Sequence, residues 1–158
     1  MLKRIDQEMF AALSAAAQTA VRLRKHHNFH TSYADPSQRM LVAIEPGSYV
    51  RPHRHLATPK PEAFLVLQGR LALTTFNDDG SVREAVVLGP GEETLGVDLP
   101  AGIWHTVVCL ATGTIFYETK PGPFCPTPEQ DLAPWAPAEG SDQVAACLRA
   151  LVAAVKAR

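Results

Sequence analysis

The sequence predicts a mainly β domain, built as a sandwich or barrel of short strands with one helix near each end. Between about residues 39 and 120, apolar or alternating runs are separated by turn residues, which is the pattern of many short strands. Near the two ends, apolar residues instead recur at steps of three and four. A chain of 158 residues can bury a core without disulfides, so we expect a single domain over 1–158.

The first element is expected to be a helix over about residues 7–21, with Asp6 as its N-cap. A basic segment, 22–30, follows this helix and contains His26 and His27. Because charged runs are usually exposed, we interpret this segment as a solvated linker, and a binding patch is the alternative.

Six short strands are expected to form the barrel over about residues 39–120. The Asn-Asp-Asp-Gly sequence at 77–80 should close a hairpin, because these residues tolerate the backbone of tight turns. The expected strands are Met40–Glu45, Ala63–Leu67, Leu71–Phe76, Val82–Leu88, Trp104–Leu110 and Thr114–Thr119.

The segment 120–140 contains six prolines, so it is expected to be neither regular helix nor central strand. It also contains Phe124 and Trp135, and we therefore expect it to lie packed over one opening of the barrel with at least one of these rings buried. A last amphipathic helix is expected over about 142–156.

The composition gives no sign of a macromolecular partner. A net charge of −1 with 20% charged residues provides no field for nucleic acid or for an anionic membrane. The three cysteines have no paired spacing, which favours a reducing compartment such as the cytoplasm. We also expect neither an export signal nor a membrane anchor.

Four side chains are the candidate ligands of one metal ion. His53 and His55 lie two residues apart, so in a strand both point to the same side. Glu62 begins the next apolar run, and a hairpin return would bring it beside the pair; His105 starts another strand after a tight turn. Neutral imidazoles and one carboxylate suit one divalent transition-metal ion: Zn, Fe, Mn, Ni, Co or Cu. A surface His-x-His pair without metal is the alternative.

The same residues resemble the two motifs of the cupin superfamily. In the first motif, a glycine precedes His-x-His by five residues, and a glutamate precedes a second glycine by six. The second motif contains Pro-x-Gly, two residues and a histidine. The matching residues are Gly47, His53, His55, Glu62 and Gly69, followed by Pro100, Gly102 and His105. The resemblance implies a cupin fold, a double-stranded β-helix or jelly-roll barrel, with these three histidines and Glu62 as metal ligands.

The chain departs from the family pattern at three places. Six residues separate His55 from Glu62, so the loop is longer than usual and Lys60 stands where the shorter spacing would place the glutamate. Glu62 is assigned because its distance to the second glycine matches. Thr94 and Cys109 replace the outer glycine and asparagine of the second motif, which affects the surroundings of the ligands more than the ligands.

Longer blocks resemble the WbuC-type cupin fold metalloproteins, a group found with bacterial O-antigen and related polysaccharide genes. The resemblance covers about residues 24–140 and implies a setting in surface polysaccharide metabolism rather than a known reaction. The blocks are Asn28–His30, Gln38–Arg39, Gly47–His55, Lys120–Phe124 and Ala133–Gly140.

Five residues are candidates for binding a substrate. In a strand, Arg51 would lie on the same face as His53 and His55. It should therefore point into the barrel and bind an anion, or else form an outward salt bridge. Glu118 and Lys120 share one face, either as an internal ion pair or as pocket residues. His30 is either a pocket residue or a structural cap, and Lys60 lies near the metal or is solvated.

Three functions are consistent with this sequence. The first is an isomerase, epimerase or lyase type enzyme acting on a small anionic or sugar-derived metabolite. The second is an iron-dependent dioxygenase. The third is a non-catalytic, metal-dependent module that binds a small molecule. In each case the expected partner is a small, anionic ligand; the catalytic residues are not identified, and a homodimer is expected by analogy with other cupins.

Overall fold

The computed structural model describes residues 2–156, which form ten helices and strands and one short 3-10 helix. The order confirms a mainly β chain with one α-helix near each end. The elements are α1 (Gln7–Thr19), β1 (Arg24–Asn28), β2 (Ser37–Ile44), β3 (Glu62–Gln68), β4 (Leu71–Phe76), β5 (Val82–Leu88), β6 (Gly96–Leu99), β7 (Trp104–Cys109), β8 (Thr114–Pro121), η1 (Glu129–Asp131) and α2 (Val144–Lys156).

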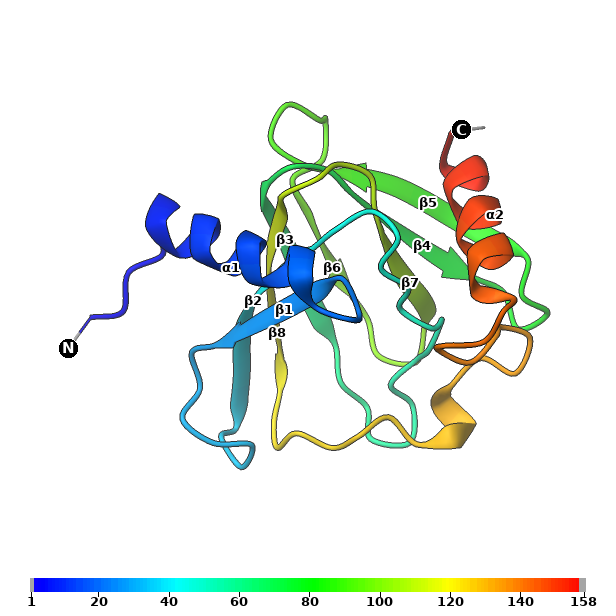
Figure 1. Cartoon of the computed structure of the whole chain (residues 1–158). Helices are drawn as coiled ribbons and strands as arrows, with labels where there is room; N and C mark the ends of the chain where they lie inside the picture. Colours follow the sequence, from blue (N-terminus) through cyan, green and yellow to red (C-terminus); the bar gives the residue numbers. More distant parts are fainter. Residues whose placement is uncertain (1, 157–158) are drawn as a thin grey trace.

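The strands form two antiparallel sheets that face each other (Figure 1). The larger sheet has the order β1-β2-β8-β3-β6, and the smaller has the order β5-β4-β7. Strands distant in sequence lie side by side, since β8 pairs with both β2 and β3. This closed arrangement of two sheets is the cupin barrel that the motifs predicted.

Each helix covers the outer face of one sheet. Phe10, Leu13 and Ala17 of α1 pack on the outer side of β2 and β8, where Leu41 and Ile115 are buried. On the far side, α2 packs over β4, β5 and β7 of the smaller sheet (Figure 1). Within residues 2–156, neither helix has the length and apolar character needed to cross a membrane.

The inner face of the larger sheet follows the alternation of the strands. Along β2, side chains at even positions from Gln38 to Ile44 face the interior of the barrel, while Leu41 and Ala43 pack against α1. On β8 the inward side chains are Phe116, Glu118 and Lys120. On β8, polar groups thus lie at one end of this face and an apolar group at the other, which places a polar site near one mouth of the barrel.

All six expected strands are present, but two others were missed. The segment interpreted as a solvated linker is wrong in part, because residues 24–28 form the edge strand β1. Its register pairs Asn28 with Met40, His26 with Val42 and Arg24 with Ile44, so these polar side chains lie beside inward-facing ones. The short strand β6 was also missed. The N-cap role of Asp6 is confirmed, since its carboxylate accepts from the Met9 amide at 3.0 Å.

The proline-rich segment runs from the end of β8 to α2 and is attached to the barrel (Figure 1). The indole of Trp135 is half-buried and lies 4.8 Å from the Phe76 ring, measured between centroids. The Phe124 side chain is instead 46% exposed. Phe124 and Thr127 line the cavity, so this segment forms part of its rim.

Candidate metal centre

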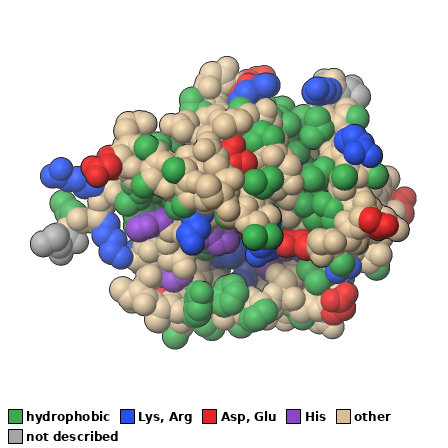
Figure 2. All heavy atoms as spheres, viewed as in Figure 1, with side chains coloured by type: hydrophobic (Ala, Val, Ile, Leu, Met, Phe, Trp, Pro, Cys, Tyr) green, Lys and Arg blue, Asp and Glu red, His purple; other side chains and the backbone are tan. Residues whose placement is uncertain are grey.

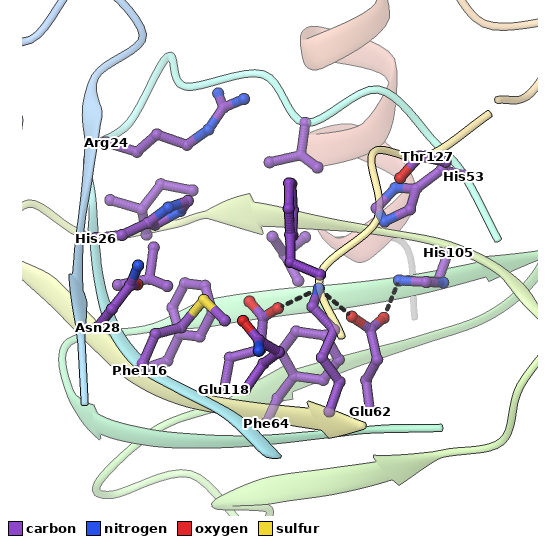
Figure 3. Close-up of a pocket in the computed structure, with 18 of the residues that line it drawn as sticks. Arg24, His26, Asn28, His53, Glu62, Phe64, His105, Phe116, Glu118 and Thr127 are labelled. Atoms are coloured by element: carbon purple, nitrogen blue, oxygen red, sulfur yellow. Dashed lines mark hydrogen bonds and ion pairs between the residues drawn. The ribbon is translucent and has the colours of Figure 1, made fainter. Parts of the chain in front are cut away.

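His53, His55, Glu62 and His105 come together in one cluster, with one nitrogen or oxygen from each lying within 4.8 Å of the others. The two neighbouring histidines lie in the loop between β2 and β3, Glu62 is the first residue of β3, and His105 lies in β7. Figure 3 shows His53, Glu62 and His105 directed toward one another. The structure therefore brings together the four residues that the motif spacing selected.

Backbone pairing fixes the two histidines that come from distant segments. The His53 amide donates to the His105 carbonyl at 3.0 Å, and the His105 amide donates to the His53 carbonyl at 2.8 Å. This bridge joins the loop before β3 to the start of β7. The imidazole centroids of the two residues lie 4.5 Å apart as a result.

Hydrogen bonds orient the imidazoles so that Nε2 faces the cluster. Nδ1 of His53 lies 3.0 Å from the Arg51 carbonyl, and Nδ1 of His105 lies 2.9 Å from the Ile103 carbonyl. Because a carbonyl can only accept, each Nδ1 carries the hydrogen and each Nε2 keeps a lone pair. This is the tautomer that a metal ligand requires.

Two buried atoms of the cluster, Nε2 of His55 and Oε2 of Glu62, form no hydrogen bond among the described residues and contact only other atoms of the cluster: Glu62 Oε1 lies 3.3 Å from the first and His105 Nε2 lies 2.9 Å from the second. Buried polar atoms are normally hydrogen-bonded. Two neighbouring buried atoms that form no hydrogen bond therefore indicate that a further group binds between them. Three imidazole nitrogens and one carboxylate oxygen fit a divalent transition-metal ion. These residues would hold one such ion, and their geometry supports a metal-binding cupin.

Glu62 is a buried carboxylate surrounded by positive or hydrogen-bonding groups. Its oxygens lie 2.9 Å from His105 Nε2, 3.3 Å from His55 Nε2 and 2.7 Å from Lys120 Nζ. Burial alone would raise the pKa of Glu62, but the two imidazoles and the Lys120 ammonium outweigh it and hold the pKa well below its usual range. The carboxylate is therefore charged and can bind a cation.

His53 is held neutral in the metal-free protein. Burial, followed by the neighbouring His105, lowers the pKa of His53 from 6.5 to about 3. A neutral imidazole is the form that coordinates a metal, so the ring does not need to lose a proton first.

Glu118 and Lys120 are both an ion pair and cavity residues. Their charged groups lie 2.7 Å apart, and Lys120 Nζ also lies 2.7 Å from Glu62 Oε1. Burial would lower the pKa of Lys120, but the two carboxylates raise it above its usual value, so the ammonium stays charged. Oε1 of Glu62 thus contacts both Lys120 and His55, while Oε2 contacts His105.

A cavity of about 450 Å³ opens beside the cluster. Apolar side chains of β2, β3, β7 and β8 form its floor, with Phe64 and Phe116 among them. The inward side chains of β1, including His26 and Asn28, form the opposite wall in Figure 3. Figure 2 shows histidine, lysine and arginine side chains gathered in the hollow below α1.

Comparison with known proteins identifies the family. The family described as "Domain of unknown function (DUF6016)" matches residues 5–88, which is more than half of the chain and includes three of the four cluster residues. The chain belongs to the DUF6016 family. Among curated proteins, none matches this DUF6016 chain.

Solved structures similar to this DUF6016 chain share its fold at low sequence identity. KdgF from Halomonas sp. is 14% identical with a TM-score of 0.50, over 65% of this chain and 82% of that one. An oxalate oxidase in complex with the substrate analogue glycolate is 15% identical with a TM-score of 0.50, over 66% and 53%. Procruciferin, an 11S globulin from Brassica napus, is 14% identical with a TM-score of 0.51, over 66% and 27%. The chain spans only about half and a quarter of the last two.

The structure corrects the expectations for Arg51 and Lys60 in this DUF6016 chain. Arg51 does not line the cavity; its guanidinium donates to the Ala133 carbonyl at 3.0 Å and lies 3.6 Å from Glu129. The inward direction predicted from strand alternation was wrong because residues 51–55 form a loop with one isolated bridge rather than a strand. Lys60 is neither solvated nor in the cavity, because it is buried with its ammonium donating to the Pro123 carbonyl.

His30 serves both of the roles considered for it. Its Nδ1 lies 3.1 Å from the Arg39 amide, which caps a strand position, and its side chain lines the cavity. Nε2 of His30 is buried and has no hydrogen-bond partner in the part of the chain described.

Sequence reasoning missed Asp131, which holds the loop that carries the histidine pair. Its Oδ2 accepts from the amides of Leu56 at 3.1 Å and Ala57 at 2.9 Å, and its carbonyl accepts from the Arg54 amide at 2.9 Å. Its only signal in the sequence was an acidic residue inside the long proline-rich segment, which by itself indicates a solvated loop.

Proposed function

We propose that this protein is a metal-dependent enzyme that acts on a small anionic or sugar-derived metabolite, by isomerase, epimerase or lyase type chemistry. The observation that carries the proposal is that three residues of the cluster, His53, Glu62 and His105, line a cavity that is also lined by Lys120 and Glu118. A site with ligands, a charged donor and a second carboxylate in one cavity has the groups that proton-transfer chemistry needs.

The charges at this end of the cavity favour an acidic ligand. Glu62 and Glu118 carry two negative charges and Lys120 one positive charge, which leaves one net negative charge when the histidines are neutral. A divalent ion would turn this into one net positive charge inside a buried site. Because an uncompensated buried charge is costly, an anionic ligand is the partner that balances it.

The surrounding side chains have separate roles in this proposal. A divalent ion held by the four side chains supplies polarisation of a ligand oxygen. The Lys120 ammonium, 2.7 Å from each of two carboxylates, donates to an anionic group of the ligand. The Glu118 carboxylate, held in place by Lys120, accepts a proton from the bound ligand.

The setting of this activity is also proposed. The sequence blocks that resemble WbuC-type cupin fold metalloproteins support a role in bacterial surface polysaccharide metabolism, including O-antigen biosynthesis. We further propose a cytoplasmic protein that forms a homodimer, which light scattering tests against the monomer mass of 17.1 kDa.

Metal content is the first test. Protein purified without added metal should contain about one equivalent of a divalent transition metal by elemental analysis. The double variant His53→Ala, His55→Ala should lose it, and His27→Ala, which lies outside the cluster, should retain it. Undiminished metal in the double variant would remove these residues from the site.

Ligand binding and turnover are the second test. Calorimetry of the metal-loaded protein with sugar phosphates, nucleotide sugars, small carboxylates and neutral sugars should select an acidic compound. Lys120→Gln should weaken that compound by about tenfold, the loss of one charge-assisted hydrogen bond. Preference for neutral sugars contradicts the proposal. Binding without conversion, followed by NMR, would favour a binding module, and oxygen consumption would favour an iron dioxygenase.

A further inference from the structure

The mouth of the cavity carries two aromatic side chains that contact each other. Tyr33 and Phe124 come from segments far apart in sequence, yet their ring centroids lie 4.9 Å apart with an interplanar angle of 36°. Both line the cavity, and they are 63% and 46% exposed. Two adjoining aromatic rings left in water at a cavity mouth form an apolar surface that a ligand can cover.

The backbone around these rings is tied together before any ligand arrives. The Phe124 amide donates to the Tyr33 carbonyl at 2.7 Å, and the Gly122 amide donates to the Pro36 carbonyl at 2.9 Å. These bonds join the loop after β1 to the start of the proline-rich segment. A surface that is already ordered costs less entropy when it binds a ligand.

A buried imidazole nitrogen lies next to this surface. Nδ1 of His30 lies 3.1 Å from both the amide and the carbonyl of Arg39, so it pairs with the Arg39 backbone in either neutral tautomer. His30 is only 7% exposed, and its Nε2 has no partner among residues 2–156. A ligand hydroxyl, which both donates and accepts, would satisfy Nε2 in either tautomer.

We propose that Tyr33, Phe124 and His30 form a second subsite, which binds the ring of an acidic sugar whose acidic group lies at the metal centre. This inference rests on the proposed function and names its substrate class. The apolar C–H face of a sugar ring covers the two aromatic rings. A sugar hydroxyl, which both accepts and donates, pairs with His30 Nε2 and with other polar groups of the wall such as Asn28.

The geometry disfavours a flat base held between the two rings. Rings that hold a planar group between them are separated by about two stacking distances, whereas the centroids of Tyr33 and Phe124 are 4.9 Å apart. The pair therefore presents one continuous surface instead of a slot.

The first experiment compares an acidic sugar with an acid that has no ring. Calorimetry of the metal-loaded protein should show glucuronate binding about tenfold more tightly than glycerate, the gain expected for one aromatic contact and one hydrogen bond. In the double variant Tyr33→Ala, Phe124→Ala, the ratio of glucuronate affinity to glycerate affinity should fall toward one, while the affinity for glycerate stays unchanged. Leu95→Ala, an exposed apolar residue that does not line the cavity, should keep the wild-type ratio.

The second variant tests the buried imidazole nitrogen. In His30→Asn, the side-chain amide can still pair with the Arg39 backbone, but the Nε2 atom that faces the ligand is gone. Glucuronate affinity should fall by about fivefold with glycerate unchanged. A thermal melt of each variant establishes that it is folded. If His30→Asn lowered the affinity for glucuronate and for glycerate equally, His30 would have a structural role only, and its place in the subsite would be overturned.

The outcomes separate this inference from the proposed function. If both acids bind wild-type protein equally well, the subsite is overturned and the anion site stands. If adenosine monophosphate shows the larger dependence on the aromatic pair, the sugar assignment is overturned. If neither acid binds, the proposed function fails; methyl glucoside then decides the subsite, because NMR shifts at Tyr33 and Phe124 support it and unshifted signals overturn it.

Discussion

At the scale of single residues, the buried carboxylate of Asp131 controls a site that it does not touch. It accepts two backbone hydrogen bonds from Leu56 and Ala57, directly after the histidine pair. Its oxygen also lies 3.5 Å from Nε of Arg54, whose guanidinium lies over the Trp104 ring at 4.2 Å. The loop of the ligand histidines is therefore held by the proline-rich segment.

Asp131→Ala should destabilise the protein by about 3 kcal/mol, because two buried amides lose a charged acceptor. It should also weaken metal binding while leaving all four cluster residues in the chain. Urea unfolding measures the first effect and a metal titration the second. Glu129→Ala is the matched control on the same short helix; its side chain is 84% exposed, so it should cost less than about 1 kcal/mol. Equal effects of the two changes would refute the role of Asp131.

The sequence allowed the cluster to be predicted, but not its surroundings. His53, His55, Glu62 and His105 were found because spacing within strands and turns decides which side chains meet. Arg51 was misplaced because the path of a loop with Pro52 depends on contacts made 80 residues away, at Ala133. Such long-range contacts leave no local pattern.

At the scale of elements, strand β1 shows why an edge strand can escape detection. Its five residues are all polar, with no buried position. Its pairing with β2 and its cover by α1 stabilise it, and neither is visible in the segment itself. By contrast, β4 and β5 were located with correct ends, because apolar runs and a clear turn sequence bound them.

The turn between β3 and β4 depends on Gly69. Its φ is +77°, and a Cβ there would lie 2.4 Å from Thr114 Oγ1 and 2.7 Å from Thr114 Cα. Gly69→Ala should therefore cost about 3 kcal/mol, from the left-handed backbone and the overlap together. Gly91 is the matched control, because it has φ +94° but no atom within 4 Å of the place that a Cβ would take, so Gly91→Ala should cost only about 1 kcal/mol. Similar unfolding midpoints for both variants would show that the contact with Thr114 is unimportant.

At the scale of the whole molecule, the two-sheet topology was predicted as a class but not in its strand order. Turn residues and alternation located six of the eight strands of the described structure. The pairing of β8 joins it to residues at least 70 positions earlier in β2 and at least 47 positions earlier in β3, and many alternative pairings would bury similar side chains. The order becomes visible only once the sheets are formed.

The global stability of the metal-free protein should fall in mild acid because of His53. Its pKa is about 3 when folded and 6.5 otherwise, so as the pH falls below about 6.5 the unfolded chain takes up a proton that the folded chain does not. Stability is thus fully present above pH 6.5 and declines by up to about 1.4 kcal/mol per pH unit down to about pH 3.

Urea unfolding of chelator-treated protein between about pH 5 and 6.5 measures the histidines, because the carboxyl groups are then ionised in both states. Burial also lowers the pKa of His26, so comparison with a His53 variant is needed to separate the two residues. His53→Gln should show a shallower decline than the parent chain, and His27→Gln should match the parent. Identical slopes for the parent and His53→Gln would indicate that His53 titrates in the folded protein as it does in the unfolded chain.

The four cluster residues belong to parts of the molecule that separate when it unfolds: Glu62 to the larger sheet, His105 to the smaller, and the histidine pair to a loop. An ion bound by all four would link the two sheets of the barrel. Its binding site would form only after both sheets have folded. Since the unfolded chain has no such site, each tenfold rise in free metal above saturation would add about 1.4 kcal/mol to the stability of the folded state. The concentration of free metal would then set how stable the folded protein is.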